Sequence, residues 1–455
     1  MRALQAGDQL EVTVEKIVPG GEGLGKVMGF PIFVPGGLPG DRGAVEMVSV
    51  KKEYGRGLMF ERWEASPQRV VPPCPLTERC GGCQWQHFDY PAQLTTKRAL
   101  LLESLARIGK LAPEHLEALT APVLGMRDPW HYRNKGQFPV QQGPQGLEAG
   151  FYAPRSHDLV PVERCLLHPE ALNHALNTTV RLLNAAGIPA SDATQRSGFL
   201  RHIILRQAFD SGHLLLGLVS RVWDHPALAQ LVTELARELP NLVGIVQNYH
   251  PQPGNRILGF ENRLLYGCAT LSEQLGGLRF ELSLPSFFQV NPPQTEVLYD
   301  TVKAMANLQG HEQVLDAFAG AGTIGIWLAR HCRDVICLES VPEAIADGQR
   351  NAALNQLNNL RFIQGQVERE LPQLLAAQSP DCVILDPPRK GCEAAVLDVL
   401  LEHPVARIVY VSCNPATLAR DLERLSSGYT PVRIQPVDLF PHTHHLETAV
   451  QLVRN

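Results

Sequence analysis

Cys413 stands where an α/β enzyme would place a nucleophile. An apolar run at 408–412 reads as a buried strand that ends at this cysteine, and Asn414-Pro415 then turns the chain toward a helix expected from about residue 416. Open α/β sheets bind their ligands at the carboxyl ends of parallel strands. A helix N-terminus just beyond the thiol would favour its thiolate. Cys413 is therefore a candidate nucleophile, with an ordinary small core residue as the alternative.

Asp386 occupies a second position of this kind, at the end of the strand in ILDPP (384–388). A hydride-transfer enzyme has no evident use for a carboxylate followed by two rigid prolines, whereas a methyltransferase can turn it toward its acceptor. Amino-directed methyltransferases carry an aromatic residue after such prolines, and this chain has Arg389 instead. The motif therefore favours methyl transfer to carbon, a reaction that needs a nucleophile such as Cys413.

A glycine-rich loop, DAFAGAGTIG (316–325), joins an earlier strand to its helix. Gly320, Gly322 and Gly325 match the dinucleotide fingerprint, and Glu339 ends the next strand, where a carboxylate would accept hydrogen bonds from ribose hydroxyls. The loop by itself fits a nicotinamide or flavin enzyme as well as an enzyme that uses S-adenosylmethionine.

A third group of reactive side chains lies far upstream, in CPLTERCGGC. Cys74, Cys80 and Cys83 have ligand spacing, and the two glycines between the last pair let the loop fold back so that both sulfurs face one centre. Cys165 is the candidate fourth ligand. Four thiolates suit a tetrahedral zinc ion or an iron–sulfur cluster, and their spacing does not choose between the two.

The elements that must position these residues form three successive patterns. Residues 1–64 contain four or five short strands broken by glycines, typical of a small β-barrel. Residues 65–284 begin with a proline-rich linker and the cysteines and continue as a mixed α+β domain. From 285 to 455 strands and helices alternate, which predicts a doubly wound, mostly parallel sheet with an antiparallel edge formed by the last strands.

Composition limits the class of protein. The chain has 455 residues, a net charge of −5 and no apolar run of membrane-spanning length. The N-terminus lacks the apolar core of a signal peptide, so a cytoplasmic location and no membrane partner are expected. The run 130–135, WHYRNK, interleaves aromatic and basic residues, which suits contacts with bases and phosphates or, alternatively, a half-buried strand.

Taken together, the motifs resemble the RNA uracil-5-methyltransferase family, in its iron–sulfur-containing branch acting on 23S rRNA. The resemblance spans nearly the whole chain and rests on the barrel, which is like a TRAM (OB-like) domain, and on CPLTERCGGC with Cys165, FFQVN, DAFAGAGTIG, DPPRKG, VSCNP and HLETAV. It implies a Rossmann-like class I methyltransferase domain and a helix at about 91–112 that packs with it. It also implies an enzyme whose substrate is RNA, with a tRNA uracil-5-methyltransferase and, more remotely, an amino-directed nucleic-acid methyltransferase as alternatives. A monomer is expected, and a non-enzymatic RNA-binding protein is the third class of function that the sequence leaves open.

The resemblance further implies the ligands and their residues. A [4Fe–4S] cluster would be held by Cys74, Cys80, Cys83 and Cys165, and S-adenosylmethionine by Gln289, Phe318, Gly320, Thr323, Glu339, Gln366 and Asp386. Many members of the family have Asn in place of Thr323. A thiolate that adds to C6 of uracil activates C5, so we assign that attack to Cys413 and expect Asp386 to orient the uracil. Glu447 in HLETA is the expected base, with His442, His444 and His445 as rivals.

Overall fold

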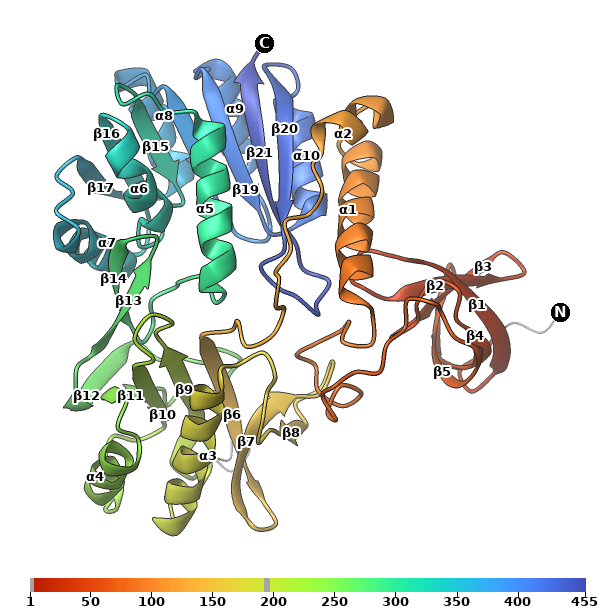
Figure 1. Ribbon diagram of the computed structural model, residues 1–455, viewed down its shortest axis with the longest axis vertical. Coiled ribbons are helices and arrows are strands. Elements are labelled where there is room, and N and C mark those ends of the chain that lie inside the picture. The colour runs from red at the N-terminus through yellow and green to blue at the C-terminus, as the bar shows by residue number, and fades with distance from the viewer. Residues whose placement is uncertain (1–3, 192–196) are drawn as a thin grey trace.

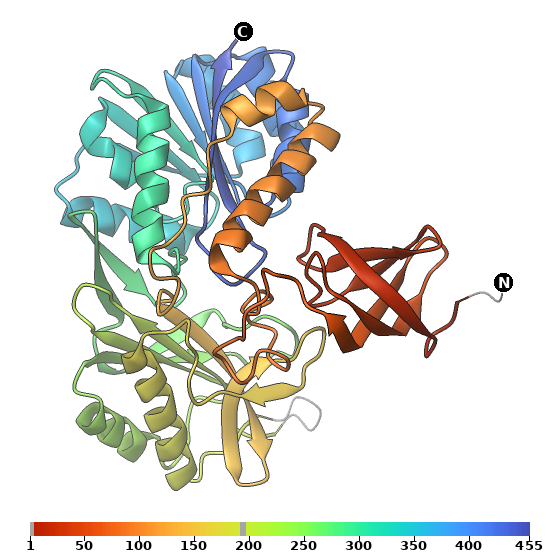
Figure 2. The ribbon, with the colours of Figure 1, turned by 45° about the vertical axis from the view of Figure 1, so that its right-hand side comes forward.

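The computed structural model describes residues 4–191 and 197–455 and divides them among three large β-structures. A barrel lies to one side, a mixed sheet forms the lower body and a second seven-stranded sheet forms the upper body (Figures 1 and 2). No helix in the described ranges is both long and apolar enough to cross a membrane. The three predicted patterns thus correspond to three β-structures in the same chain order.

The barrel closes in the strand order β1-β2-β3-β5-β4, with β1 also paired to β4. Its strands are β1 (Gln9–Ile17), β2 (Gly23–Val27), β3 (Phe30–Val34), β4 (Arg42–Val50) and β5 (Gly55–Glu64). Alternate side chains such as Val12, Val14 and Val45 point inward and form a small apolar core, as the period of two requires. This confirms the predicted small barrel, for which the sequence allowed four or five strands, and the structure has five.

The middle of the chain forms a seven-stranded sheet in the order β12-β11-β10-β9-β6-β7-β8, in which only β10 and β11 are parallel. Helices α3 and α4 cover one face of it with leucine side chains. The elements are β6 (Lys135–Gly143), β7 (Gly146–Tyr152), β8 (Leu159–Pro161), α3 (Glu170–Ala185), β9 (Leu200–Gln207), β10 (Leu214–Ser220), α4 (Leu228–Glu238), β11 (Leu242–Tyr249) and β12 (Glu261–Gly267).

The C-terminal sheet has the order β17-β16-β15-β18-β19-β21-β20, with five parallel strands and an antiparallel pair at the end. The predicted doubly wound sheet with an antiparallel edge is therefore confirmed. The elements are α5 (Pro292–Ala306), β15 (Gln313–Ala317), α6 (Thr323–Leu328), β16 (Asp334–Glu339), α7 (Pro342–Leu354), β17 (Leu360–Gln364), α8 (Val367–Ala377), β18 (Cys382–Leu385), α9 (Ala394–Glu402), β19 (Arg407–Ser412), α10 (Pro415–Leu425), β20 (Tyr429–Val437) and β21 (Glu447–Arg454).

Two segments from earlier in the chain complete this C-terminal unit. Helix α1 (Tyr90–Arg107), followed by α2 (Pro113–Leu119), lies beside α10, and its Leu101 and Leu105 are buried in the same core as the C-terminal sheet (Figure 1). The hairpin β13 (Thr270–Leu275) and β14 (Leu278–Ser283) packs against α7 and adds Phe280 to the other core of the sheet. The C-terminal domain was expected to begin at residue 285. The hairpin at 270–283 lies before that boundary, although it packs in the core of the C-terminal sheet.

Candidate active site

The register of the C-terminal sheet brings the predicted catalytic residues to one edge. Leu385 pairs with Tyr410, so the residues that follow β18 and β19 lie next to each other, and these include Asp386. Ser412 pairs with Thr448 in the antiparallel strand β21, which places Cys413 beside Glu447. Three side chains separated by up to 61 positions in sequence therefore meet because the last strand inserts next to β19.

Cys413 is partly exposed at the start of α10, whose first residue is Pro415 and whose N-cap is Asn414. The Asn414 side chain accepts a hydrogen bond of 3.0 Å from the Ala416 N–H. Burial, followed by the nearby carboxyls of Glu447 and Asp386, raises the pKa of the Cys413 thiol to about 11. The expected lowering of this pKa by the helix start is therefore outweighed, and the resting site holds a thiol.

Glu447 and Asp386 are carboxyls without an ion-pair partner among the described residues, although the charge of Arg389 partly offsets the rise in the Glu447 pKa. Glu447 is 4% exposed, and burial together with the charge of Asp386 raises its pKa well above the ordinary value. Asp386 keeps some exposed surface, but surrounding protein removes enough water to raise its pKa to about 7. No hydrogen bond or ion pair between described residues holds either carboxyl group. A buried carboxylate of raised pKa is a stronger base than an exposed one, which suits proton removal from carbon.

The glycine-rich loop leaves room for a ligand next to these groups. Gly320 and Gly322 have φ of +56° and +67°, and a Cβ added at Gly320 would meet no atom within 4 Å. Glu339 fastens the loop, because its Oε2 accepts a hydrogen bond of 2.8 Å from the Gly320 N–H. Asp316 is buried with one oxygen unpartnered, and burial raises its pKa to about 8. Open space above a loop with a free buried acceptor fits a nucleoside-containing ligand.

The other residues predicted to bind the cofactor lie in or near the same loop, and their side chains differ in how exposed they are to solvent. Phe318 belongs to it and has a left-handed φ of +67°, while Thr323 begins α6 and its hydroxyl lies 2.7 Å from that of Tyr299. Gln289 is half-buried between β14 and α5, and Gln366 is exposed at the start of α8. Gly365, next to Gln366, donates a 2.9 Å hydrogen bond to the Glu339 carbonyl, which brings this loop beside the end of β16.

The four cysteines predicted to hold a cluster are drawn together by their loops. The pKa of the Cys83 thiol is raised to about 12 by burial, with smaller contributions from Cys165, Cys80 and Cys74. The Gly82 N–H donates a 3.4 Å hydrogen bond to the Cys80 sulfur. Nevertheless, within 4–191 and 197–455 no set of three or more His, Cys, Asp or Glu side chains is arranged as a metal site. The donor set suits a soft metal or a cluster, while the arrangement itself does not form a coordination shell.

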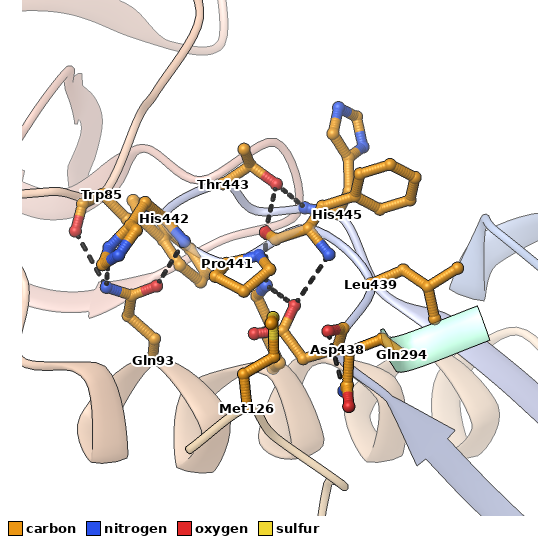
Figure 3. A network of polar contacts seen from close by, with 12 residues as sticks. Trp85, Gln93, Met126, Gln294, Asp438, Leu439, Pro441, His442, Thr443 and His445 are labelled. Atoms are coloured by element: carbon orange, nitrogen blue, oxygen red, sulfur yellow. Dashed lines mark hydrogen bonds and ion pairs between the residues drawn. The ribbon is translucent and has the colours of Figure 1, made fainter. Parts of the chain in front are cut away.

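A polar network that the motifs did not reveal lies under the segment between β20 and β21, residues 438–446, which we call the catalytic loop (Figure 3). Lys97 of α1 donates a 2.6 Å hydrogen bond to Asp438, and both side chains are completely buried. Tyr90 donates to the other Asp438 oxygen at 3.0 Å. Gln294 of α5 donates to the Asp438 carbonyl at 3.0 Å. These residues carry no catalytic motif, and a buried lysine in a helix with basic edges gave no local signal.

The three histidines of the catalytic loop have different surroundings. His442 is buried, stacks on Trp130 with ring centroids 3.8 Å apart, and has its pKa lowered to about 3 by burial. His444 and His445 instead line a pocket of about 220 Å³ together with Cys413, Arg389 and the barrel residues Pro19 and Gly20. Burial lowers the pKa of both, that of His445 to about 3. His442 is therefore held as part of the structure, whereas the other two face the opening above Cys413.

Comparisons with known proteins agree with this geometry. Residues 276–455 match the model of the tRNA (uracil-5-)-methyltransferase family, and residues 3–60 match the TRAM domain. An uncharacterized RNA methyltransferase of Halalkalibacterium halodurans is 42% identical over 448 residues, which cover 98% of this chain and 97% of the relative. One from Listeria innocua is 40% identical over 451 residues, covering 99% and 98%.

Among solved structures, the chain resembles the Pyrococcus abyssi tRNA (uracil-54, C5)-methyltransferase in complex with S-adenosyl-L-homocysteine. The TM-score is 0.79 at 24% identity, and the match covers 98% of this chain and 100% of the other. This likeness shows a shared fold over the entire length, and the full-length relatives show the family. The chain is a member of the S-adenosylmethionine-dependent RNA methyltransferases and carries a TRAM barrel and a uracil-5-methyltransferase domain.

Proposed function

We propose that the chain methylates carbon 5 of a uridine in 23S rRNA through a covalent bond between Cys413 and C6 of the uracil. The observation that carries this proposal is the convergence of Cys413, Glu447 and Asp386 at one strand edge beside the glycine-rich loop. Uracil C5 is a poor nucleophile until a thiolate adds at C6 and turns C5 into an enolate carbon. When bound, S-adenosylmethionine supplies the electrophilic methyl group.

The residues have separate tasks in this proposal. Partly exposed Cys413 loses its proton to solvent, and the resulting thiolate forms the sulfur–C6 bond while the C5–C6 π electron pair moves toward O4. After C5 has become methylated, Glu447 takes the C5 proton, the C5–C6 double bond re-forms and the thiolate leaves. Asp386 orients the uracil edge by a hydrogen bond. The raised pKa of Glu447 makes its ionised carboxylate a strong base for this step.

The donor is held by the loop that surrounds the open space at Gly320. Glu339 supports this loop, and Gln289, Phe318, Thr323 and Gln366 would complete the walls. One oxygen of buried Asp316 has no hydrogen-bond partner in the protein, which supports a ligand in this position because buried polar atoms are normally hydrogen-bonded. Calorimetric titration with S-adenosylhomocysteine tests the assignment, and unchanged affinity in Gly320→Val would refute it.

A fluorinated substrate tests the covalent step. RNA that contains 5-fluorouridine should form a stable adduct with the wild-type protein, because fluorine at C5 cannot leave as a proton. Cys413→Ala should form none, and Cys392→Ala, which removes a buried thiol elsewhere in the same domain, should behave like the wild type. An adduct in Cys413→Ala would overturn the assignment of the nucleophile.

We further propose that Cys74, Cys80, Cys83 and Cys165 bind a [4Fe–4S] cluster. The mutual influence of the four thiols on their pKa values supports a common site, and thiolates are the ligands that such clusters use. The protein purified without oxygen should be brown, with labile sulfide and visible absorbance that Cys83→Ser removes. Colourless protein that holds zinc would overturn this part of the proposal.

The RNA target needs its own test, because the structural neighbour acts on tRNA uracil-54. A target in tRNA is therefore the second candidate. Mass mapping of ribosomal RNA and tRNA from a deletion strain should show one or more 5-methyluridines missing from 23S rRNA. Loss confined to tRNA would reject the rRNA target and leave the chemistry intact.

A further inference from the structure

The catalytic loop leads directly into Glu447, yet much of what holds it comes from outside the C-terminal sheet. His442 in this loop has a left-handed φ of +64°, a conformation that a residue with a side chain adopts only when its surroundings enforce it. Part of these surroundings consists of two segments, one following Cys83 and one following Cys165, that are hydrogen-bonded to the catalytic loop. Each reaches the loop through its own chain of hydrogen bonds, and the two end on neighbouring residues.

The first connection starts at Cys83. Trp85 follows two positions later, and its backbone N–H donates a 3.0 Å hydrogen bond to the His442 carbonyl. Gln93 closes this link, because it donates to the Trp85 carbonyl at 3.0 Å and accepts from the His442 N–H at 3.0 Å (Figure 3). The Trp85 indole also donates to the carbonyl of Gly21 in the barrel at 3.0 Å. Trp85 is 1% exposed, so these bonds are protected from water.

The second connection starts at Cys165. The carbonyls of the next two residues, Leu166 and Leu167, accept hydrogen bonds of 2.9 and 2.8 Å from the N–H groups of His131 and Arg133. Tyr132 lies between these two donors and is 1% exposed. Its hydroxyl donates a 3.0 Å hydrogen bond to the carbonyl of Pro441. The segment after Cys165 is therefore tied to the residue that precedes His442.

We infer that Trp85 and Tyr132 are positioning residues through which the two cysteine-bearing segments hold the catalytic loop, and with it Glu447, in the reactive arrangement. The inference rests on the base role proposed for Glu447. Pro441 and His442 lie six and five positions before Glu447, so a shift of the loop reaches the start of β21. The cysteine segments thereby belong to the structure of the active centre although their sulfurs take no part in methyl transfer.

Tyr132→Phe tests the second connection with minimal disturbance of packing. We expect turnover on ordinary RNA to fall roughly fivefold to tenfold, because the buried Pro441 carbonyl loses its donor, with KM for RNA changed less than twofold. The covalent adduct should accumulate on ordinary RNA, since proton removal slows while attack by Cys413 continues. Tyr429→Phe is the matched control: this tyrosine is also 1% exposed and donates to the Leu400 carbonyl at 3.1 Å. It should lower Tm to a similar extent and leave turnover unchanged.

Hydrogen–deuterium exchange of the peptide 438–446 gives a readout that does not depend on activity. Exchange there should become roughly tenfold faster in Tyr132→Phe and in Cys165→Ser, and stay at the wild-type rate in Tyr429→Phe. The double variant Tyr132→Phe/Cys165→Ser should exchange no faster than the more affected single variant, because both changes interrupt one connection. If Cys165→Ser does not fold, Tyr132→Phe alone decides the outcome.

Different results would overturn the positioning role of Trp85 and Tyr132 and the covalent mechanism of the proposed function. Wild-type exchange rates at 438–446 in Tyr132→Phe, or equal kinetic effects in Tyr132→Phe and Tyr429→Phe, would overturn the positioning role. A wild-type protein that traps no adduct with 5-fluorouridine RNA would instead reject the covalent mechanism, and the exchange experiment would still report on the connection between the cysteine segments and the loop.

Discussion

Asp438 and Glu447 are buried carboxyls nine positions apart in the chain, and the side chains around them differ in kind. In the network under the catalytic loop, Asp438 has Lys97 at 2.6 Å and Tyr90 at 3.0 Å as partners. At the edge of the C-terminal sheet, Glu447 and Asp386 have no ion pair and no hydrogen-bond donor among the described residues, and their pKa values are raised although the charge of Arg389 partly offsets the rise for Glu447. A buried carboxylate that has a cation and a donor as partners holds the segments that carry them in one arrangement. A buried carboxyl that has no such partners instead has a raised pKa. The protein uses the first kind to hold the loop and the second kind in the candidate site.

The largest effect should come from removing the proposed base, Glu447. Glu447→Gln keeps the shape of the side chain and should lower turnover by about 10²–10⁴-fold, measured by methyl incorporation into RNA. Its stability to urea should stay equal to the wild type or increase, because a buried carboxyl without partners contributes no favourable pairing. Full turnover in Glu447→Gln would transfer the base role to His444 or His445.

Breaking the partnered group should instead affect stability. Lys97→Met leaves Asp438 as a buried charge without its cation, which should lower the free energy of unfolding by about 3–5 kcal/mol. The double variant Lys97→Met/Asp438→Asn should recover much of this loss, since both charges are then absent. Urea denaturation measures both values, and a Lys97→Met loss under about 1 kcal/mol would show that the pair does not hold the loop.

The pH dependence of adduct formation tests whether the carboxyls without partners raise the pKa of Cys413. Its pKa of about 11 means that the reactive thiolate is the minor form at neutral pH, so the rate of adduct formation with 5-fluorouridine RNA should rise roughly tenfold per pH unit between about pH 7 and 9. In Glu447→Gln the carboxylate that contributes to the raised Cys413 pKa is absent, so the rise in the rate of adduct formation should shift to lower pH. A rate that is flat across this range would contradict the raised pKa.

The smallest expected effect concerns Asp316, the third buried carboxyl near the site. Because burial raises its folded-state pKa to about 8, the folded protein retains this proton at pH values where the unfolded chain has lost it. The resulting stabilisation is complete below about pH 4 and is lost as the pH rises through about 8. Asp316→Asn should therefore raise Tm by a few degrees at pH 8.5 and by less at pH 5, measured by scanning calorimetry.

Much of the fold and the site edge could be predicted because they depend on local signals. Apolar runs that end at Asp386 and Cys413 identify strand ends, and alternation of strands and helices predicts the sheet. The barrel follows from short strands broken by glycines. Helix α3 was not predicted, although Leu172, Leu176 and Leu183 lie buried along one face, because the residues of low helix propensity at 177–179, Asn-Thr-Thr, weaken its helical signal.

Other features depend on contacts between distant segments, which a single sequence does not show. Nothing around Lys97 indicates that its partner lies 341 positions later, and the links of Trp85 and Tyr132 to the catalytic loop depend on the same docking. The Cys413 pKa was expected to fall because only the helix start was visible in the sequence. Burial and two carboxyls brought in by other strands reverse that shift.

In the proposed reaction a nucleotide would approach Cys413 through the pocket that the barrel residues Pro19 and Gly20 line together with His444. A Cβ at Gly21 would lie 2.8 Å from the His444 Cβ and 3.1 Å from the Trp85 indole nitrogen. The absence of a side chain at this one position thus lets the rim of the barrel close against the catalytic half of the protein. A larger residue there would have to push the barrel away from His444 and Trp85, so we expect a side chain at position 21 to change the shape of the pocket at Cys413.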